Sequence, residues 1–246
     1  PPEIEGTTSL LNACPDLAAR ALAVIHMDMV GGDAEITKAV FHVTRSPKSL
    51  PTFVDDVGSA FGRFVNEQSY SLAATGEAPY PLVDPEGSKR ALQAEFVDFT
   101  EGSDHEVWSE GSWRVPAIYL NDWPDRYIHT HADGVANIDP TKLMRAAFLG
   151  AASAWYLAGL DAAQVPALWE VIRRGSLRRT TSCVSTSLRK PRWWNRSTVS
   201  PRCPPACGRA RTSTSRGCGG WWGFQKRSRW ERRTSSIAAR PIPRGR

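Results

Sequence analysis

Three short polar segments of this chain carry side chains that could coordinate a metal ion or transfer a proton. They are His-Met-Asp-Met-Val-Gly-Gly at residues 26–32, Gly-Ser-Asp-His at 102–105 and Tyr-Ile-His-Thr-His-Ala-Asp at 127–133. Each adjoins an apolar, strand-like run, and an open α/β sheet presents its reactive groups at the ends of its strands. Carboxylates and imidazoles are ligands of divalent metals, so this set favours a metal-dependent hydrolase.

Asp28 ends an apolar run directly before a glycine pair. A charged carboxylate in that position must be compensated by a metal ion, a cation or several hydrogen bonds. The ordinary alternative is that Asp28 caps the next turn. His26 lies two residues earlier, so on a strand it would share a face with Asp28. The two could ligate one ion together, or His26 could be a satisfied histidine of the core.

The third polar segment contains His129 and His131, two residues apart, followed by Asp133. Two imidazoles with a nearby carboxylate to orient one ring suit a metal site. The alternative is a solvated polar loop, and we assign His131 to that alternative.

Ser103, Asp104 and His105 are residue types used in nucleophilic catalysis. Neighbours in sequence do not form a catalytic triad, because a triad is assembled in space. Asp104 could instead cap the helical turn that follows it. Glu3 and Glu5 could act as a base or a ligand, although two glutamates near a terminus do not by themselves indicate a functional site.

Apolar runs and helical periodicity place these segments in an α/β domain. Strands are expected at 21–29, 38–44, 95–99 and 115–120, and helices at 7–13 and 50–68. A polar connection containing Pro and Gly is expected at 70–92. The last helix begins at Asp139-Pro140, where a capping Asp precedes Pro. Strands alternating with helices predict a three-layer α/β/α domain around a mixed, mostly parallel sheet.

The last helix contains the longest apolar stretch of the chain, residues 146–160. With 15 residues it is too short to cross a bilayer, so we expect a core helix and no membrane partner. Its apolar side is predicted to carry Leu143, Ala147, Leu149, Trp155 and Leu157.

Composition divides the chain near residue 172. Residues 1–172 carry 11 basic and 24 acidic side chains, whereas residues 173–246 carry 20 basic side chains and a single glutamate. The second segment also has few aliphatic residues, so it cannot build a core of its own. We therefore predict a catalytic domain at 1–172 and a basic, disordered tail at 173–246.

Three interpretations of the tail are open. It could be a basic arm for nucleic acid, with its tryptophans as stacking groups. It could bind zinc through Cys203, Cys207 and Cys218, although their spacing fits no ordinary zinc pattern. It could also be the out-of-frame translation of a GC-rich gene, which yields Arg, Pro, Gly, Ser, Cys and Trp with few acids. We favour the third interpretation, under which nucleic acid is no partner of the protein.

The ordered motifs resemble those of the co-catalytic di-zinc aminopeptidases, the family that also contains glutamate carboxypeptidase-like enzymes. Asp-Met-Val-Gly at 28–31 is similar to the end of a strand in that family, and Ser-Asp-His at 103–105 precedes an apolar strand with Val-Pro-Ala at 115–117. Ile-His-Thr-His-Ala-Asp-Gly at 128–134 and Ile-Asp-Pro at 138–140 follow in the family's order. The resemblance covers about residues 1–160.

This resemblance implies an aminopeptidase that uses two zinc ions and acts on peptides with a free N-terminus. By position, Asp28 would ligate one zinc ion and His129 the other. Glu3 falls where the family places its acidic pair, so it would be the catalytic general base or a further ligand. Tyr127 and His105 would contact substrate.

Two departures from the family pattern affect this expectation. The upstream His-x-Asp segment, which supplies a His ligand and the bridging carboxylate, is not found, so we expect a domain truncated at its N-terminus and inactive as it stands. Ile128 replaces the family's oxyanion-stabilising Tyr. The alternative function is a non-enzymatic protein that binds nucleic acid or zinc through the tail. No signal segment is evident, and the cellular location is left open.

Overall fold

The computed structural model describes residues 2–109 and 111–189. Of residues 184–189 it describes the backbone alone. Within it, four strands alternate with seven α-helices and two short 3₁₀ helices. The strands are β1 (Val24–Met27), β2 (Val40–Thr44), β3 (Glu95–Val97) and β4 (Ala117–Trp123). The α-helices are α1 (Glu5–Ala13), α2 (Pro15–Arg20), α3 (Ala34–Thr37), α4 (Val54–Thr75), α5 (His105–Ser109), α6 (Pro140–Ala158) and α7 (Val165–Arg189). The 3₁₀ helices are η1 (Val135–Asn137) and η2 (Ala162–Gln164).

The four strands form one mixed sheet in the order β1-β4-β2-β3. Strand β4 pairs in parallel with β1 and antiparallel with β2, and β2 pairs in parallel with β3. The sheet is therefore mostly parallel, as predicted. Because β1 and β4 run side by side in one direction, the segments that follow them leave from the same edge of the sheet.

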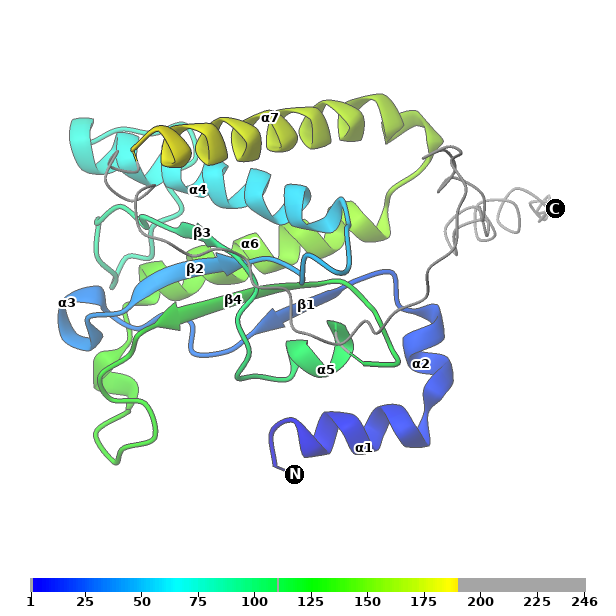
Figure 1. Ribbon diagram of the computed structural model, residues 1–246. Coiled ribbons are helices and arrows are strands. Elements are labelled where there is room, and N and C mark those ends of the chain that lie inside the picture. The colour runs from blue at the N-terminus through cyan, green and yellow to red at the C-terminus, as the bar shows by residue number, and fades with distance from the viewer. Residues whose placement is uncertain (1, 110, 190–246) are drawn as a thin grey trace, which may run out of the picture. The chain divides into compact units, whose positions relative to one another are not determined.

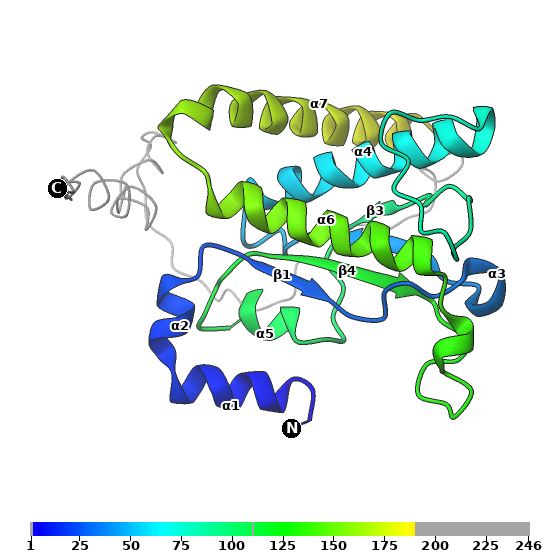
Figure 2. The ribbon, with the colours of Figure 1, turned by 180° about the vertical axis from the view of Figure 1, so that it is seen from behind.

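Helices cover both faces of the sheet, which confirms the predicted three-layer α/β/α fold (Figure 1). Helices α4 and α6 pack on one face, and α7 lies on the outer side of α4. Helices α1, α2 and α5 lie on the other face, as the reverse view also shows (Figure 2). Each face has its own apolar cluster, one containing Phe41, Ile118 and Leu149 and the other containing Leu11 and Val115.

Helix α4 approaches the sheet closely because two glycines, one turn apart, face it. A Cβ at Gly58 would lie 2.8 Å from Ile118 Cδ1, and one at Gly62 would lie 2.9 Å from Phe96 Cε1. Larger residues would push the helix off the sheet, since cores tolerate little overpacking.

Helix α6 begins as predicted, since Asp139 caps it by accepting a hydrogen bond from Thr141 N and Pro140 is its first residue. The predicted apolar side is partly wrong. Trp155 is 84% exposed and Leu143 is 41% exposed. Leu149 and Leu157 are buried as predicted. The buried side also carries small and charged residues, among them Arg145, which is 2% exposed and donates to the carbonyls of Leu82 and Arg90.

Helix α7 runs through the boundary that composition places at residue 172 and continues to Arg189. It packs on α4, where Arg179 forms an ion pair with the buried Asp56. Gly175 makes this approach possible, because a Cβ there would collide with the Asp56 carboxylate. Arginine is also a good helix former, so a basic segment can extend a helix that has a packing partner. The predicted cysteine site at 203–218 lies outside the described residues.

No single helix of the described ranges is long and apolar enough to cross a membrane. Taken together, one pair of helical segments has the length and apolar composition of a membrane span, but the chain bends by 113° between them. The pair is Pro140–Ala158 and Ala162–Cys183.

Asp55, in the first turn of α4, is expected to make stability depend on pH. Burial raises the pKa of Asp55 to about 6, although its Oδ1 accepts a hydrogen bond from Ser46 N. Because this carboxyl binds its proton more tightly in the folded state than in the unfolded state, its contribution to stability falls as the pH rises from about 4 to about 6. Asp55→Asn should flatten that part of the curve of unfolding free energy against pH, measured by urea denaturation. An unchanged slope would contradict the assignment.

Candidate metal centre

The candidate site lies where β1 ends, on the face of the sheet that carries α1 and α5. His26 lies on β1 and Asp28 directly follows it, and because alternate residues of an extended chain point the same way, both side chains reach Ser103. Ser103 precedes α5, and Glu3 precedes α1. Three segments far apart in sequence therefore meet at one place.

The Ser103 hydroxyl connects the other three side chains. Its Oγ lies 2.6 Å from His26 Nε2, 2.5 Å from Glu3 Oε1 and 3.0 Å from Asp28 Oδ2. Ser103 itself is fully buried. A hydroxyl has one proton, so it can donate to only one of the two carboxylates at a time. The other carboxylate then keeps its charge without a donated hydrogen bond from Ser103.

The site is rich in negative charge. The carboxylates of Asp28, Asp104 and Glu3 all act on His26 and favour its protonation, but burial is the larger effect and lowers the pKa of His26. No Lys or Arg of the described residues forms an ion pair with these three carboxylates. A cation would therefore be stabilised here.

Glu3, His26 and Asp28 fit a divalent metal ion. Each offers one ligand atom, and the three atoms lie within 4.8 Å of one another. Two carboxylate oxygens and one imidazole nitrogen form a donor set that zinc accepts, and three protein ligands leave a position open for water or substrate. Glu3 is exposed, whereas His26 and Asp28 are half-buried, so the group can be reached from solvent.

A hydrogen bond and a buried ion pair hold the segments that carry these ligands. Ile4 N donates to Asp104 Oδ1 at 2.6 Å, which ties the residue after Glu3 to the residue after Ser103. Beyond Asp28, the turn at Gly32 is held by Asp122 Oδ2, which accepts from Gly32 N at 2.9 Å. Lys142 Nζ neutralises Asp122 Oδ1 at 2.6 Å. The segments next to the candidate ligands are thus held by contacts outside the group.

The structure brings the predicted residues Glu3 and Asp28 together, but His129 does not belong to this group of ligands. His129 lies in the exposed loop after β4, with a backbone φ of 58°. Tyr127 lies in the same loop, where its ring is 5.1 Å from the Arg126 guanidinium carbon. The roles assigned to His129 and Tyr127 stay predictions.

His105 lies beneath the surface, with 1% of its area exposed. Its ring stacks on Tyr119, with 4.0 Å between the centroids, and its Nε2 is 2.7 Å from the Thr100 carbonyl oxygen. Burial lowers the pKa of His105. Contact between this ring and a substrate, as the sequence predicts, would require the covering segments to move.

From the sequence, His26 is either a ligand or a core histidine, and no local pattern indicates that Ser103 contacts the metal ligands. The two-residue spacing of His26 and Asp28 on a strand was the signal for the first. Asp104, for which a helix cap was one possibility, accepts instead from Ile4 N across 100 residues of sequence, and no local pattern predicts such a contact.

No family model matches the chain, and no curated protein matches it. Among solved structures, the chain is similar to the aminopeptidase from Aneurinibacillus sp. strain AM-1, with a TM-score of 0.39 and 21% sequence identity. The alignment covers 63% of this chain and 30% of that one. The chain therefore spans about three tenths of the length of that enzyme.

Proposed function

We propose that this protein is a hydrolase that uses a divalent metal ion, zinc by preference, held by Glu3, His26 and Asp28. The observation that carries the proposal is the convergence of these three ligand atoms within 4.8 Å, at a site with no compensating Lys or Arg among the described residues. The motif resemblance to zinc aminopeptidases supports peptides with a free N-terminus as substrates.

A bound divalent metal polarises a carbonyl oxygen and lowers the pKa of water. The protein's own groups would perform the remaining tasks. Glu3 is the exposed member of the group, and only its Oε1 contacts Ser103. Its other oxygen would then ligate the metal, and the alternative role of general base, which the motif resemblance also allows, stays a prediction.

Asp28 and His26 would be the more firmly held of the three ligands. Both are half-buried and fixed by Ser103. The burial that lowers the pKa of His26 favours a neutral imidazole, the form with a free lone pair for a metal. A second zinc ion, as the resemblance implies, would need His129 and ligands beyond this group.

The test uses the full chain, stripped of metal by a chelator and then titrated with ZnCl₂ in a calorimeter. We expect one zinc ion to bind per chain. The loaded protein is then incubated with a peptide and with its N-acetylated form, and products are followed by mass spectrometry. Loss of the first residue from the unblocked peptide alone, prevented by chelator, would support the aminopeptidase. Absence of saturable zinc binding would refute the proposal.

A further inference from the structure

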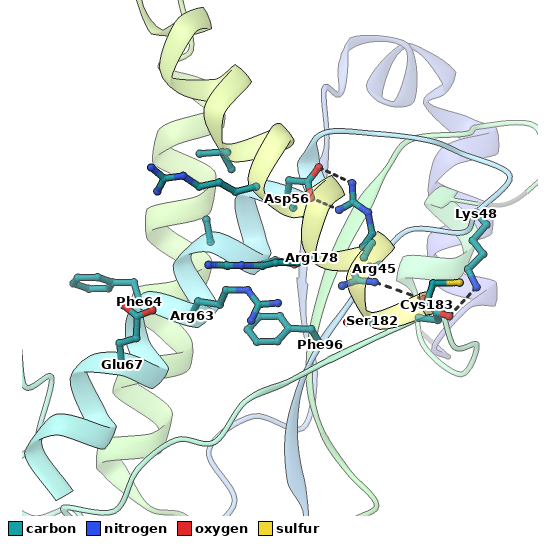
Figure 3. A pocket seen from close by; sticks show the side chains of 17 residues that line it. Arg45, Lys48, Asp56, Arg63, Phe64, Glu67, Phe96, Arg178, Ser182 and Cys183 are labelled. Atoms are coloured by element: carbon teal, nitrogen blue, oxygen red, sulfur yellow. Dashed lines mark hydrogen bonds and ion pairs between the residues drawn. The ribbon is translucent and has the colours of Figure 1, made fainter. Parts of the chain in front are cut away.

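A solvent-open pocket of about 800 Å³ lies on the opposite face of the sheet, lined by α4, α7 and the ends of β2 and β3 (Figure 3). The metal centre lies on the face that carries α1 and α5. The lining includes six basic side chains against three acidic ones. The basic ones are Arg45, Lys48, Arg63, Arg174, Arg178 and Arg179.

Two of the three acidic side chains are already neutralised. Asp56 pairs with Arg179, and Asp98 pairs with Lys48 at 2.8 Å and with Arg45 at 3.7 Å. The remaining acid, Glu67, forms no ion pair within 4.0 Å among the described residues. The positive charge of the pocket is therefore in excess of what its own carboxylates can compensate.

Arg63 and Arg178 carry much of that excess. Figure 3 shows their guanidinium groups in the same part of the pocket. Neither forms an ion pair within the ranges 2–109 and 111–189. Burial, with the positive charges of Arg178 and Arg45, lowers the pKa of Arg63, against the smaller opposing effect of the Glu67 carboxylate. These like charges repel one another, so an anion placed among them would relieve an unfavourable arrangement.

One donor in this pocket is also left without an acceptor. The Nε of Arg45 is buried and has no hydrogen-bond partner among the described residues. A buried polar group without a partner is costly and calls for an explanation. An oxyanion would supply the missing acceptor if a shift of the Arg45 side chain opened this nitrogen to the pocket.

We propose that this pocket binds a small anion carrying two or more phosphate groups. Guanidinium groups bind phosphate oxygens through pairs of parallel hydrogen bonds, and the volume exceeds what a single phosphate would fill. A nucleic-acid strand fits less well, because the Phe96 ring that could stack on a base is covered by the Arg63 guanidinium at 4.2 Å.

The experiment titrates the metal-free full chain with inorganic pyrophosphate at low ionic strength in a calorimeter. We expect one pyrophosphate bound per chain, more weakly as salt is added. Arg63→Gln and Arg178→Gln should each weaken binding at least tenfold. Arg63→Lys, which keeps the charge and loses the planar fork, should fall between wild type and Arg63→Gln. The control is Lys89→Gln, an exposed residue that does not line the pocket.

The other outcomes overturn the proposal. Pyrophosphate binding that is equal in wild type, Arg63→Gln and Arg178→Gln would show that these two arginines do not hold the anion. Citrate that binds the pocket as tightly as pyrophosphate and displaces it would show a site for carboxylates. Tighter binding of a single-stranded oligonucleotide, lost in the same two variants, would show a nucleic-acid site. Circular dichroism of each variant establishes that loss of binding is not loss of fold.

Discussion

Replacement of Lys142 by methionine is expected to lower the free energy of unfolding by about 3–5 kcal/mol, the cost of leaving a buried charge without its partner. Lys142 is 7% exposed and Asp122 is fully buried, with 2.6 Å between Nζ and Oδ1. Lys142 Nζ also donates to the Gly32 carbonyl oxygen at 2.8 Å. Urea denaturation of wild type and Lys142→Met at pH 7 measures the difference.

Two further variants show whether charge is the cause. The double variant Lys142→Met, Asp122→Asn should regain most of the lost stability, because the side-chain oxygen of Asn can still accept from Gly32 N and no buried charge remains. Lys38→Met should change the free energy of unfolding by less than about 0.5 kcal/mol, since Lys38 and its ion-pair partner Glu35 are both exposed. A loss below 1 kcal/mol for Lys142→Met would contradict the role given to this pair.

Asp28→Asn is expected to weaken zinc binding on the order of 100-fold or more, because a neutral amide replaces a charged ligand at a site built from three groups. His26→Gln should have a similar effect. The dissociation constant is measured by competition with a chelating dye on the metal-stripped full chain. Circular dichroism at each step separates loss of the ligand from loss of the fold.

Matched controls come from the loop after β4. Asp133→Asn removes an exposed carboxylate of the same type and should leave zinc affinity unchanged. His129→Ala tests the ligand that the motif resemblance implies. If His129→Ala weakens zinc as much as Asp28→Asn while His26→Gln does not, the ion is held by the residues of the family pattern, and the group described above is not the metal site.

Local sequence patterns predict the strands of this fold and the start of helix α6. Apolar runs predict all four strands, and the Asp139-Pro140 pair predicts the start of α6 to the residue. The same signals bring His26 and Asp28 to one side of β1, since the two-residue period of a strand is a property of the backbone. Helix α4 extends past the predicted end to Thr75, where Gly76 ends it in a left-handed conformation.

Contacts between distant segments could not be read from local patterns. The Ser103 hydroxyl meets Glu3 across 100 residues and His26 across 77. The exposed position of Trp155 has the same origin, because α6 buries Arg145 and Lys142 to satisfy carbonyls and a carboxylate elsewhere in the fold. Composition likewise predicts a boundary at 172, but the pairing of Arg179 with Asp56 depends on a partner 123 residues away.

The separation of Glu3 from His26 and Asp28 along the chain has a consequence for refolding. Closing loops of this length is an entropic cost that must be met before the site exists. Zinc would then meet no complete site in the denatured ensemble, so added metal should slow unfolding and leave the refolding rate unchanged. Zinc at 100 times its dissociation constant would add about 2.7 kcal/mol to the native state.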